Sequence, residues 1–399
     1  MKFFRQVAPV VVLLLAMLFI SNSPKKQKEQ PIVVIAYYVP EKDYHPELLP
    51  LDQLTHIIFS FTHVIDGEMK FQDAENKKKL QQLVAQREKH PQLKVMIACG
   101  GWGADGFSDM ASTAENRKKF VESVVAFNKE FKLDGVDIDW EYPAIPAAGT
   151  GARPEDKQNF TLLMRELRAA LNTLDRKQIL TFASAGWKRY YKNIELESVM
   201  NEVDYMNIMT YDQVGPSSPF TGHHTPLGYI QETDIADTPA AEFIEEFRKS
   251  KPDSDRDYGP RSAEKIVQFC LDQGIKPEQL VIGAAFYGRA WKGVPPNNNG
   301  LYEKNSGAHI AWSAYHQIRE EFESNEAYKR YWDSTAKAPY LYNAKDSIFI
   351  SYDDSVSVRL KTEYALNKKL GGIMFWQLGN DTKDENSLLK SIYDASVKN

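Results

Sequence analysis

The sequence predicts an α/β fold, a (β/α)₈ (TIM) barrel with a small α+β insertion before the last strand. Eight short, almost continuously apolar segments recur along the 399 residues, and longer amphipathic segments separate them. One spacing, the one before the eighth apolar segment, is roughly twice as long as the others. Eight strands that alternate with helices form a parallel sheet, and eight is the number that closes a barrel.

The strand candidates are brief and rich in β-branched and aromatic residues. Strands with this composition are covered on both faces, as parallel barrel strands are. The eight candidates are Ile32–Val39, Thr55–Phe61, Lys94–Cys99, Gly135–Trp140, Ile179–Ser184, Tyr205–Thr210, Leu280–Phe286 and Gly372–Trp376.

The helix candidates between these strands are amphipathic. In one of them Phe120, Val124 and Phe127 share a face, while Lys118 and Glu122 lie on the other. Each crossover is long enough to hold a helix, which is what a parallel connection requires. The clearest candidates are Asn76–Lys89, Glu115–Phe131, Glu155–Asn172 and Ser262–Gln273.

The long spacing indicates an inserted subdomain at residues 290–350. It opens with Pro295-Pro296-Asn297-Asn298-Asn299-Gly300 and contains Tyr340-Leu341-Tyr342. We therefore expect residues 31–289 and 351–399 to form the barrel.

The N-terminus is typical of an export signal. Lys2 and Arg5 precede an apolar stretch from Val7 to Ile20, and small polar residues follow it. This stretch is shorter than the roughly 20 residues that span a bilayer comfortably. We expect residues 1–23 to be a signal peptide and residues 24–30 a polar linker. Both a cleaved signal and an uncleaved anchor stay open, and either one makes the protein secreted, periplasmic or attached to the cell surface.

Composition and charge narrow the function classes. A formal net charge of −5 argues against a nucleic-acid partner, which requires a basic surface. Two cysteines, Cys99 and Cys270, are too few for a disulfide framework, and we expect both to be buried and unpaired. No zinc-protease or phosphate-loop motif occurs, and the pair His223-His224 has no third ligand at useful spacing. We expect these two histidines in a rim loop, no metal, no cofactor, no membrane partner beyond the N-terminal segment, and a monomer.

The run Asp134-Gly-Val-Asp-Ile-Asp-Trp-Glu141 indicates the chemistry. Side chains alternate along a strand, so Asp137, Asp139 and Glu141 share one face, about 6.5 Å apart, while the apolar residues between them face the helices. Three inward carboxyls in a site of low dielectric cannot all ionise cheaply, so at least one pKa is raised. An acid with a raised pKa beside a carboxylate is what glycosidic bond cleavage requires.

This run resembles the Asp-x-x-Asp-x-Asp-x-Glu signature of glycoside hydrolase family 18, the chitinases. Further segments carry the resemblance over about residues 32–395: Val95–Trp102, Met209–Asp212, Phe286–Trp291 and Gly371–Trp376. The resemblance implies an exported chitinase that hydrolyses β-1,4-linked N-acetylglucosamine polymers or oligomers. It also implies a retaining mechanism in which the substrate's own 2-acetamido oxygen is the nucleophile, an exception to the two-carboxylate scheme.

Residue roles follow from the same resemblance. Glu141 would be the general acid and then the general base, Asp139 would orient the acetamido group, and Asp137 would share a proton with Asp139. Tyr211 would hydrogen-bond the acetamido group. Substrate contacts are expected from Trp376 as the floor of the cleft and from Trp102, Gly101, Tyr142, Met209, Asp212, Tyr287, Arg289, Tyr37 and Phe61.

One departure from the family pattern concerns Asp137. Ala98 stands where the third-strand motif usually has a serine, and the missing hydroxyl removes a hydrogen bond worth ~1 kcal/mol from Asp137. Asp134 lies off the acidic face, and we expect a structural role for it. Two alternatives stay open: a chitin-binding lectin on the same fold, which would typically lack the acid at Glu141, and an endo-β-N-acetylglucosaminidase acting on glycoprotein or cell-wall glycan.

Overall fold

The computed structural model describes residues 31–41, 45–256 and 258–397. The predicted signal peptide and linker lie outside these ranges. Within the ranges, no helix is long and apolar enough to cross a membrane.

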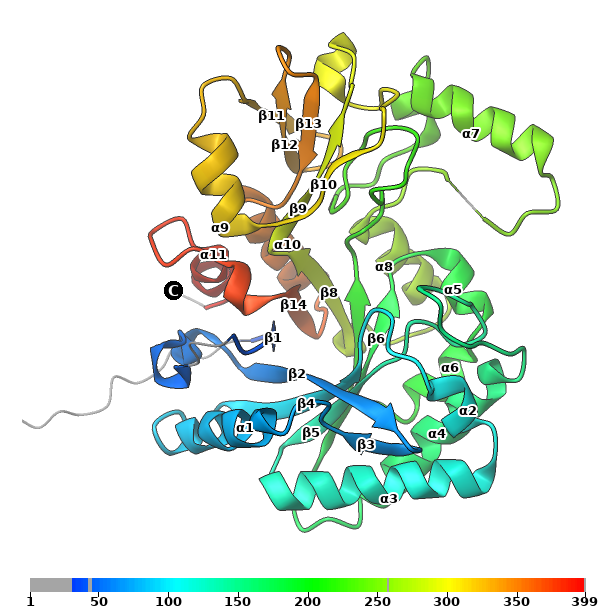
Figure 1. The fold of residues 1–399 in the computed structure, drawn as a ribbon, viewed down its shortest axis with the longest axis vertical. Helices are drawn as coiled ribbons and strands as arrows, with labels where there is room; N and C mark the ends of the chain where they lie inside the picture. The colour runs from blue at the N-terminus through cyan, green and yellow to red at the C-terminus, as the bar shows by residue number, and fades with distance from the viewer. Residues whose placement is uncertain (1–30, 42–44, 257, 398–399) are drawn as a thin grey trace, which may run out of the picture.

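Eight parallel strands form a closed barrel (Figure 1). Their order around the sheet is β1-β14-β8-β7-β6-β5-β4-β2, and pairing between β1 and β2 closes the ring. The predicted fold class is therefore confirmed, with strand ends that differ from the predicted ones by a few residues. The barrel strands are β1 (Val33–Tyr38), β2 (His56–Ile65), β4 (Lys94–Gly100), β5 (Gly135–Asp139), β6 (Ile179–Ala185), β7 (Tyr205–Met209), β8 (Leu280–Ala285) and β14 (Gly372–Trp376).

Helices in the crossovers surround the barrel. β2 extends beyond the barrel to pair with the antiparallel strand β3 (Glu68–Lys70), and short 3₁₀ turns supplement the helices. The helices are α1 (Glu75–Ala85), α2 (Phe107–Ala111), α3 (Ala114–Phe131), α4 (Asp156–Leu171), α5 (Lys188–Lys192), α6 (Leu196–Met200), α7 (Pro239–Ser250), α8 (Ala263–Asp272), α10 (Ser355–Asn367) and α11 (Leu388–Ser396).

The core has two main parts because each barrel strand buries both faces. One apolar cluster fills the space between barrel and helices and includes Val136, Ile138 and Trp140 of the acidic run. A smaller cluster inside the barrel includes Ile58, Met96 and other inward side chains. The alternation predicted for the acidic run is therefore present: its apolar residues face outward and its acids face inward.

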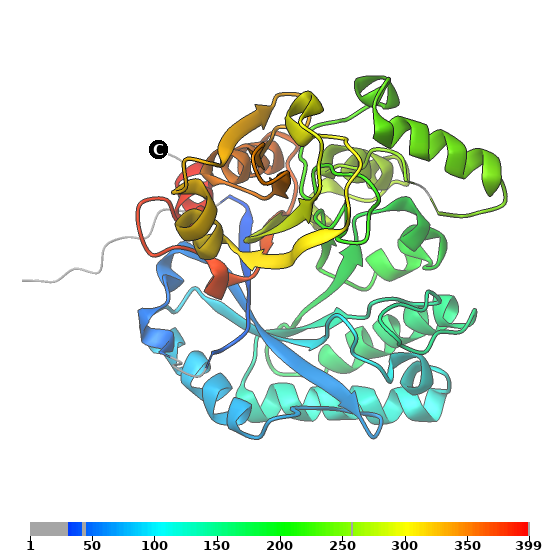
Figure 2. The ribbon, with the colours of Figure 1, turned by 45° about the horizontal axis from the view of Figure 1, so that its top comes forward.

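The insertion is a second, antiparallel sheet of order β10-β9-β13-β12-β11. Its strands are β9 (Tyr287–Lys292), β10 (Ala308–Ala314), β11 (Lys329–Asp333), β12 (Ala338–Asn343) and β13 (Ile348–Ser351), with α9 (Tyr315–Gln317) and a π-helical turn (Ile318–Glu323) between β10 and β11. The sheet begins directly after β8 and stands beside the barrel (Figure 1, Figure 2). Its position puts its side chains next to the carboxyl ends of the barrel strands.

Both cysteines are buried and unpaired, Cys99 on β4 and Cys270 on α8. Asp134 lies just before β5, where Arg87 and the backbone N–H of Val95 donate to it at 2.8 and 2.9 Å. It is therefore a structural residue that joins β5 to its neighbours, at the amino end of the strand and away from the other three acids.

Candidate active site

Three carboxyl side chains line up along the carboxyl end of β5. Asp137 and Asp139 belong to the strand, and Glu141 follows two residues after Asp139. Their relative exposures are 0%, 5% and 8%, so all three are buried. The carboxyl end of the strands is where barrel enzymes carry their active sites.

Asp137 is held by three donors from three other strands of the barrel. Tyr37 Oη donates to Oδ2 at 2.9 Å, while Thr181 Oγ1 and Asn207 Nδ2 donate to Oδ1 at 2.5 and 3.1 Å. Burial raises the pKa of Asp137 to about 6, although these three hydrogen bonds lower it. Ala98 is paired with Asp137 in the sheet register, and the missing hydroxyl on β4 is replaced by donors from β1, β6 and β7.

Asp139 and Glu141 interact strongly. Burial, together with the negative charges of Glu141 and Asp137, raises the pKa of Asp139 well above its ordinary value. Burial raises the pKa of Glu141 to about 7, against the hydrogen bond that it receives from Tyr142. Among the described residues, Oδ1 of Asp139 has no hydrogen-bond partner. The site thus offers an acid that keeps its proton near neutral pH beside a buried acceptor.

Tyr211 and Asp212 follow β7, which is two strands along the barrel from β5. Tyr211 is buried, and the partner of its hydroxyl is the sulfur of Met374 at 3.9 Å, a weak acceptor. Asp212 accepts from Tyr287 Oη at 2.9 Å and from Arg289 Nε at 2.7 Å. These contacts fix Asp212 at the junction between the barrel and the second sheet.

The charge of Asp212 is maintained by its neighbours. Burial opposes its ionisation, but the contact with His224 and the charge of Arg289 outweigh burial and lower the pKa of Asp212. His224 Nδ1 lies 3.7 Å from Asp212 Oδ1, and its side chain has no exposed surface. His223 is equally buried and contacts Asp333 at 3.0 Å. Both histidines lie in the loop that follows β7, at the carboxyl end of the barrel, and this loop is buried against the second sheet.

Aromatic rings lie around the acids. The ring of Trp376 is stacked on Phe61 with centroids 5.4 Å apart. Trp102 is 68% exposed and meets Tyr142 edge-on at 6.5 Å. Trp102 is one of the few large apolar side chains that the described residues expose.

Two predicted contact residues, Gly101 and Met209, contact other residues of the site. The backbone N–H of Gly101 donates to the carbonyl of Asp139 at 2.9 Å. With a φ of +97°, a Cβ at Gly101 would lie 2.9 Å from the Phe61 ring, so only glycine fits. Met209 ends β7 and is half-buried against the inner cluster.

Tyr37 has a different position from the one predicted. It was expected at the wall of the cleft, but it is 2% exposed, and its hydroxyl reaches Asp137 and Asn207. Its ring centroid is 6.0 Å from that of Trp376, so the two side chains pack against each other.

Sequence reasoning missed several residues of the site. Thr181 and Asn207 are inward polar residues in otherwise apolar strands, a signal that the period-2 pattern contains. Trp187 meets Tyr142 edge-on at 5.3 Å. Trp312 on β10 is 43% exposed and stacks on Tyr287 at 6.1 Å, and no local pattern separates it from a core tryptophan.

The chemistry of the site defines a class of enzyme. A carboxylic acid that keeps its proton near neutral pH can protonate a glycosidic oxygen, and a neighbouring carboxylate can stabilise the positive charge that develops at the sugar. On a (β/α)₈ barrel with exposed aromatic rings around these acids, this arrangement is that of a glycoside hydrolase.

Comparison with known proteins identifies the family. Residues 33–381 match the glycosyl hydrolases family 18, and the chain belongs to this family. Chitinase A1 of Niallia circulans is 38% identical over 314 residues, which are 76% of this chain and 42% of that protein. Chitinase B of Serratia marcescens is 29% identical over 385 residues, which are 83% of this chain and 74% of that protein. The match therefore spans less than half of the Niallia circulans relative.

A solved structure agrees with this assignment over nearly its whole length. The family 18 N-acetylglucosaminidase from Paenibacillus barengoltzii has a TM-score of 0.78 and 34% sequence identity, and the match covers 91% of this chain and 99% of that chain. The family predicted from the acidic run is confirmed.

Proposed function

We propose that the protein is an exported chitinase that hydrolyses β-1,4-linked N-acetylglucosamine polymers and oligomers with retention of configuration. The observation that carries this proposal is the pairing of a proton-retaining Glu141 with the unpartnered buried Oδ1 of Asp139. A buried acceptor without a donor costs free energy unless a ligand supplies one. The N–H of a sugar's 2-acetamido group is such a donor.

In the proposed first step Glu141 gives its proton to the glycosidic oxygen while the bond from that oxygen to C1 breaks. The substrate's acetamido oxygen attacks C1 and forms a cyclic oxazolinium ion. Asp139 accepts a hydrogen bond from the acetamido N–H, which orients the nucleophile and balances its charge, and the hydroxyl of Tyr211 donates to the acetamido oxygen.

In the second step the carboxylate of Glu141 takes a proton from a water molecule that attacks C1. The oxazolinium ring opens, and two inversions give overall retention. Asp137, fixed by its three donors, shares a proton with Asp139 and sets its pKa.

The remaining residues bind the sugars. Trp376 forms the floor under the cleaved sugar, and Asp212, held by Tyr287 and Arg289, forms a polar wall. The other proposed contacts are Trp102, Gly101, Tyr142, Met209 and Phe61, with Tyr37 acting through Trp376 and Asp137.

A second candidate is an N-acetylglucosaminidase activity. The similarity to the Paenibacillus barengoltzii N-acetylglucosaminidase over 99% of that chain favours it. Analysis of products from reduced chitooligosaccharides separates the two, because an exo-acting N-acetylglucosaminidase would release single N-acetylglucosamine units and a chitinase would release longer ones. A non-catalytic lectin is disfavoured by the acid at position 141.

We also propose the domain limits and the location. The barrel comprises residues 31–289 and 351–399, the inserted domain comprises residues 290–350, and residues 1–23 direct export to the cell surface, the periplasm or the medium as a monomer. Strands of the second sheet from Tyr287 to Ser351 support the limits of the insertion.

The mechanism is tested with chitohexaose and its fully deacetylated counterpart. We expect hydrolysis of the acetylated hexamer and none of the deacetylated one, because deacetylation removes the internal nucleophile. Glu141→Gln should bind chitohexaose with unchanged affinity and hydrolyse it about 10²- to 10⁴-fold more slowly, the usual contribution of a positioned acid. Glu197→Gln, on the exposed surface of α6, is the control. Efficient cleavage of the deacetylated hexamer would exclude the substrate-assisted mechanism.

A further inference from the structure

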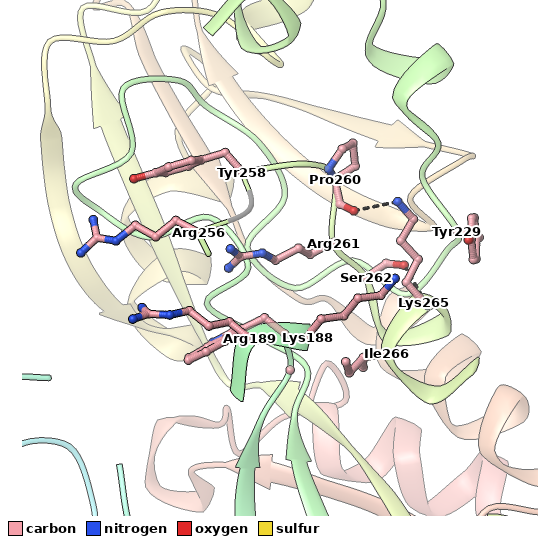
Figure 3. A pocket seen from close by; sticks show the side chains of 12 residues that line it. Lys188, Arg189, Tyr229, Arg256, Tyr258, Pro260, Arg261, Ser262, Lys265 and Ile266 are labelled. Carbon is pink, nitrogen blue, oxygen red and sulfur yellow. Dashed lines mark hydrogen bonds between the residues drawn. The ribbon is translucent and has the colours of Figure 1, made fainter. Parts of the chain in front are cut away.

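A strongly basic pocket lies beside the candidate active site. It has a volume of about 360 Å³ and lies between the turn after β6 and the segment that leads into α8 (Figure 3). This volume is within the roughly 300–1,000 Å³ typical of small-ligand sites. Its lining includes five cationic side chains and, among the described residues, no acid: Lys188, Arg189, Arg256, Arg261 and Lys265.

Two of these cations, Lys188 and Arg256, form no ion pair with an acid among the described residues. Arg189 Nε is paired with Asp255 at 2.6 Å. Lys265 Nζ donates to a backbone carbonyl at 2.8 Å and lies 5.1 Å from the ring centre of Tyr229. Lys188 Nζ lies 5.8 Å from the ring centre of Phe269.

The three arginines gather on one side of the pocket. In Figure 3 the guanidinium ends of Arg189, Arg256 and Arg261 lie toward the same side. Like charges that are brought together repel, and this occurs in a protein of net charge −5. Guanidinium groups match carboxylate and phosphate oxygens in a bidentate geometry. The pocket therefore has the chemistry of an anion site.

The pocket lies next to the row of acids on and after β5. Trp187 lines the pocket and meets Tyr142 edge-on at 5.3 Å. Tyr142 directly follows Glu141 in the chain and donates a hydrogen bond to its carboxylate. One hydrogen bond and one ring contact thus connect the proposed acid to the cationic lining, so a glycan held over Glu141 can extend a substituent past Trp187.

We propose that this pocket binds a carboxylate or phosphate substituent on the glycan, so that the enzyme prefers acidic N-acetylglucosamine polymers to neutral ones. This inference rests on the proposed glycan hydrolysis and specifies its substrate class. Attraction between exposed charges is weak and screened by salt, so the preference is a moderate factor that ionic strength controls.

The test compares three soluble chitin derivatives: neutral glycol chitin, carboxymethyl chitin, and chitin that carries phosphate esters. At low ionic strength we expect kcat/KM for at least one acidic derivative to exceed that for glycol chitin by roughly three- to tenfold, the factor expected from a few exposed ion pairs. Which acidic derivative is preferred identifies the anion. The preference should disappear at about 0.5 M salt.

Variants separate the pocket from general effects of charge. The double variant Lys188→Gln, Arg256→Gln should lose the preference for the acidic derivatives and keep its rate on glycol chitin. The charge-retaining double variant Lys188→Arg, Arg256→Lys should keep the preference. Lys78→Gln, on the exposed surface of α1, should leave all rates unchanged, because α1 lies far from α5 and α8 in Figure 1.

Equal wild-type rates on acidic and neutral derivatives at low salt would overturn the inference. So would a Gln double variant that loses the same factor on glycol chitin, because the residues would then support the fold or the cleft and bind no anion. Failure of the wild type to hydrolyse any of the three derivatives would contradict the proposed function itself.

Discussion

Replacing Glu141 by Gln should stabilise the protein above neutral pH while it removes activity. Burial raises the pKa of Glu141 from 4.5 to about 7. Because the pKa in the folded state lies above that in the unfolded state, ionisation favours unfolding. The stability that the protonated acid contributes is present in full below pH 4.5 and is lost as pH rises through about 7. The amide side chain of the variant carries no charge at any of these pH values, so the variant does not undergo this loss.

The magnitude follows from the difference between these pKa values. At 1.36 kcal/mol for each tenfold change, the difference corresponds to about 3 kcal/mol of unfolding free energy at pH 8. For a folded region of this size, ~2.1 cal/mol/K per residue converts this into a rise in Tm of about 4 °C. Loss of the Glu141 charge also lowers the pKa of Asp139, whose ionisation Glu141 opposes, and this adds in the same direction.

The assay is thermal and urea unfolding of the wild type and of Glu141→Gln at pH 5 and pH 8. We expect a clear gain at pH 8 and little difference at pH 5, where wild-type Glu141 is mostly protonated. The control Glu197→Gln, an exposed acid on α6, should show neither effect. A stability gain of equal size at both pH values, or none at pH 8, would refute the reasoning, because the benefit would then not come from the buried charge.

Three further changes test other parts of the site and the fold. Tyr37→Phe removes the donor to Asp137 Oδ2 at 2.9 Å and should lower the free energy of unfolding by about 1.5–3 kcal/mol at pH 8. The loss should be smaller at pH 5, where Asp137 is protonated, and an equal loss at both pH values would point to packing instead. Lys361→Met leaves the fully buried carboxylate of Asp353 without its cationic partner at 2.6 Å and should lower the free energy of unfolding, measured in urea, by about 3–5 kcal/mol. A loss below about 1 kcal/mol would show that water reaches this pair. Trp312→Ala should raise KM for chitohexaose about fivefold, as expected when roughly 40 Å² of buried contact with the substrate is lost. KM for chitobiose derivatives should not change, and equal effects on both substrates would place Trp312 at the cleavage point.

The acidic run shows how far strand periodicity carries a prediction. A period of two separates Asp137, Asp139 and Glu141 from Val136, Ile138 and Trp140, and the structure has the first set inside the barrel and the second in the outer core. This separation depends on local backbone geometry, which every strand shares. The strand count was predictable because each barrel strand is a short apolar run in the sequence.

The support of Asp137 was less predictable. The residue at the usual position for support is Ala98, and sequence reasoning inferred a missing hydrogen bond there. The structure instead brings Tyr37, Thr181 and Asn207 to Asp137 from positions 44 to 100 residues away in the chain. The donors come from different strands, and only the closed barrel determines which inward side chains meet at one height.

The surroundings of the two histidines and the basic pocket could not be predicted from the sequence either. His223 and His224 belong to a polar-looking loop, and the second sheet, built from residues far along the chain, is what buries them. The cations of the pocket come from two segments, 188–189 and 256–265, which lie far apart in the sequence. Their charge density exists only where the two segments meet.

The sequence by itself determined the barrel, the insertion, the family and the row of acids on β5, because hydrophobic periodicity and a short motif are local properties of the chain. Only the tertiary structure decided which donors hold Asp137, which charges flank Asp212, which tryptophans remain exposed and where cations gather. These features depend on contacts between residues far apart in the sequence, and such contacts are set when the sheet closes and the insertion packs against it. The row of acids therefore predicts the class of reaction, and the contacts that the surrounding fold makes determine the pKa values of these acids.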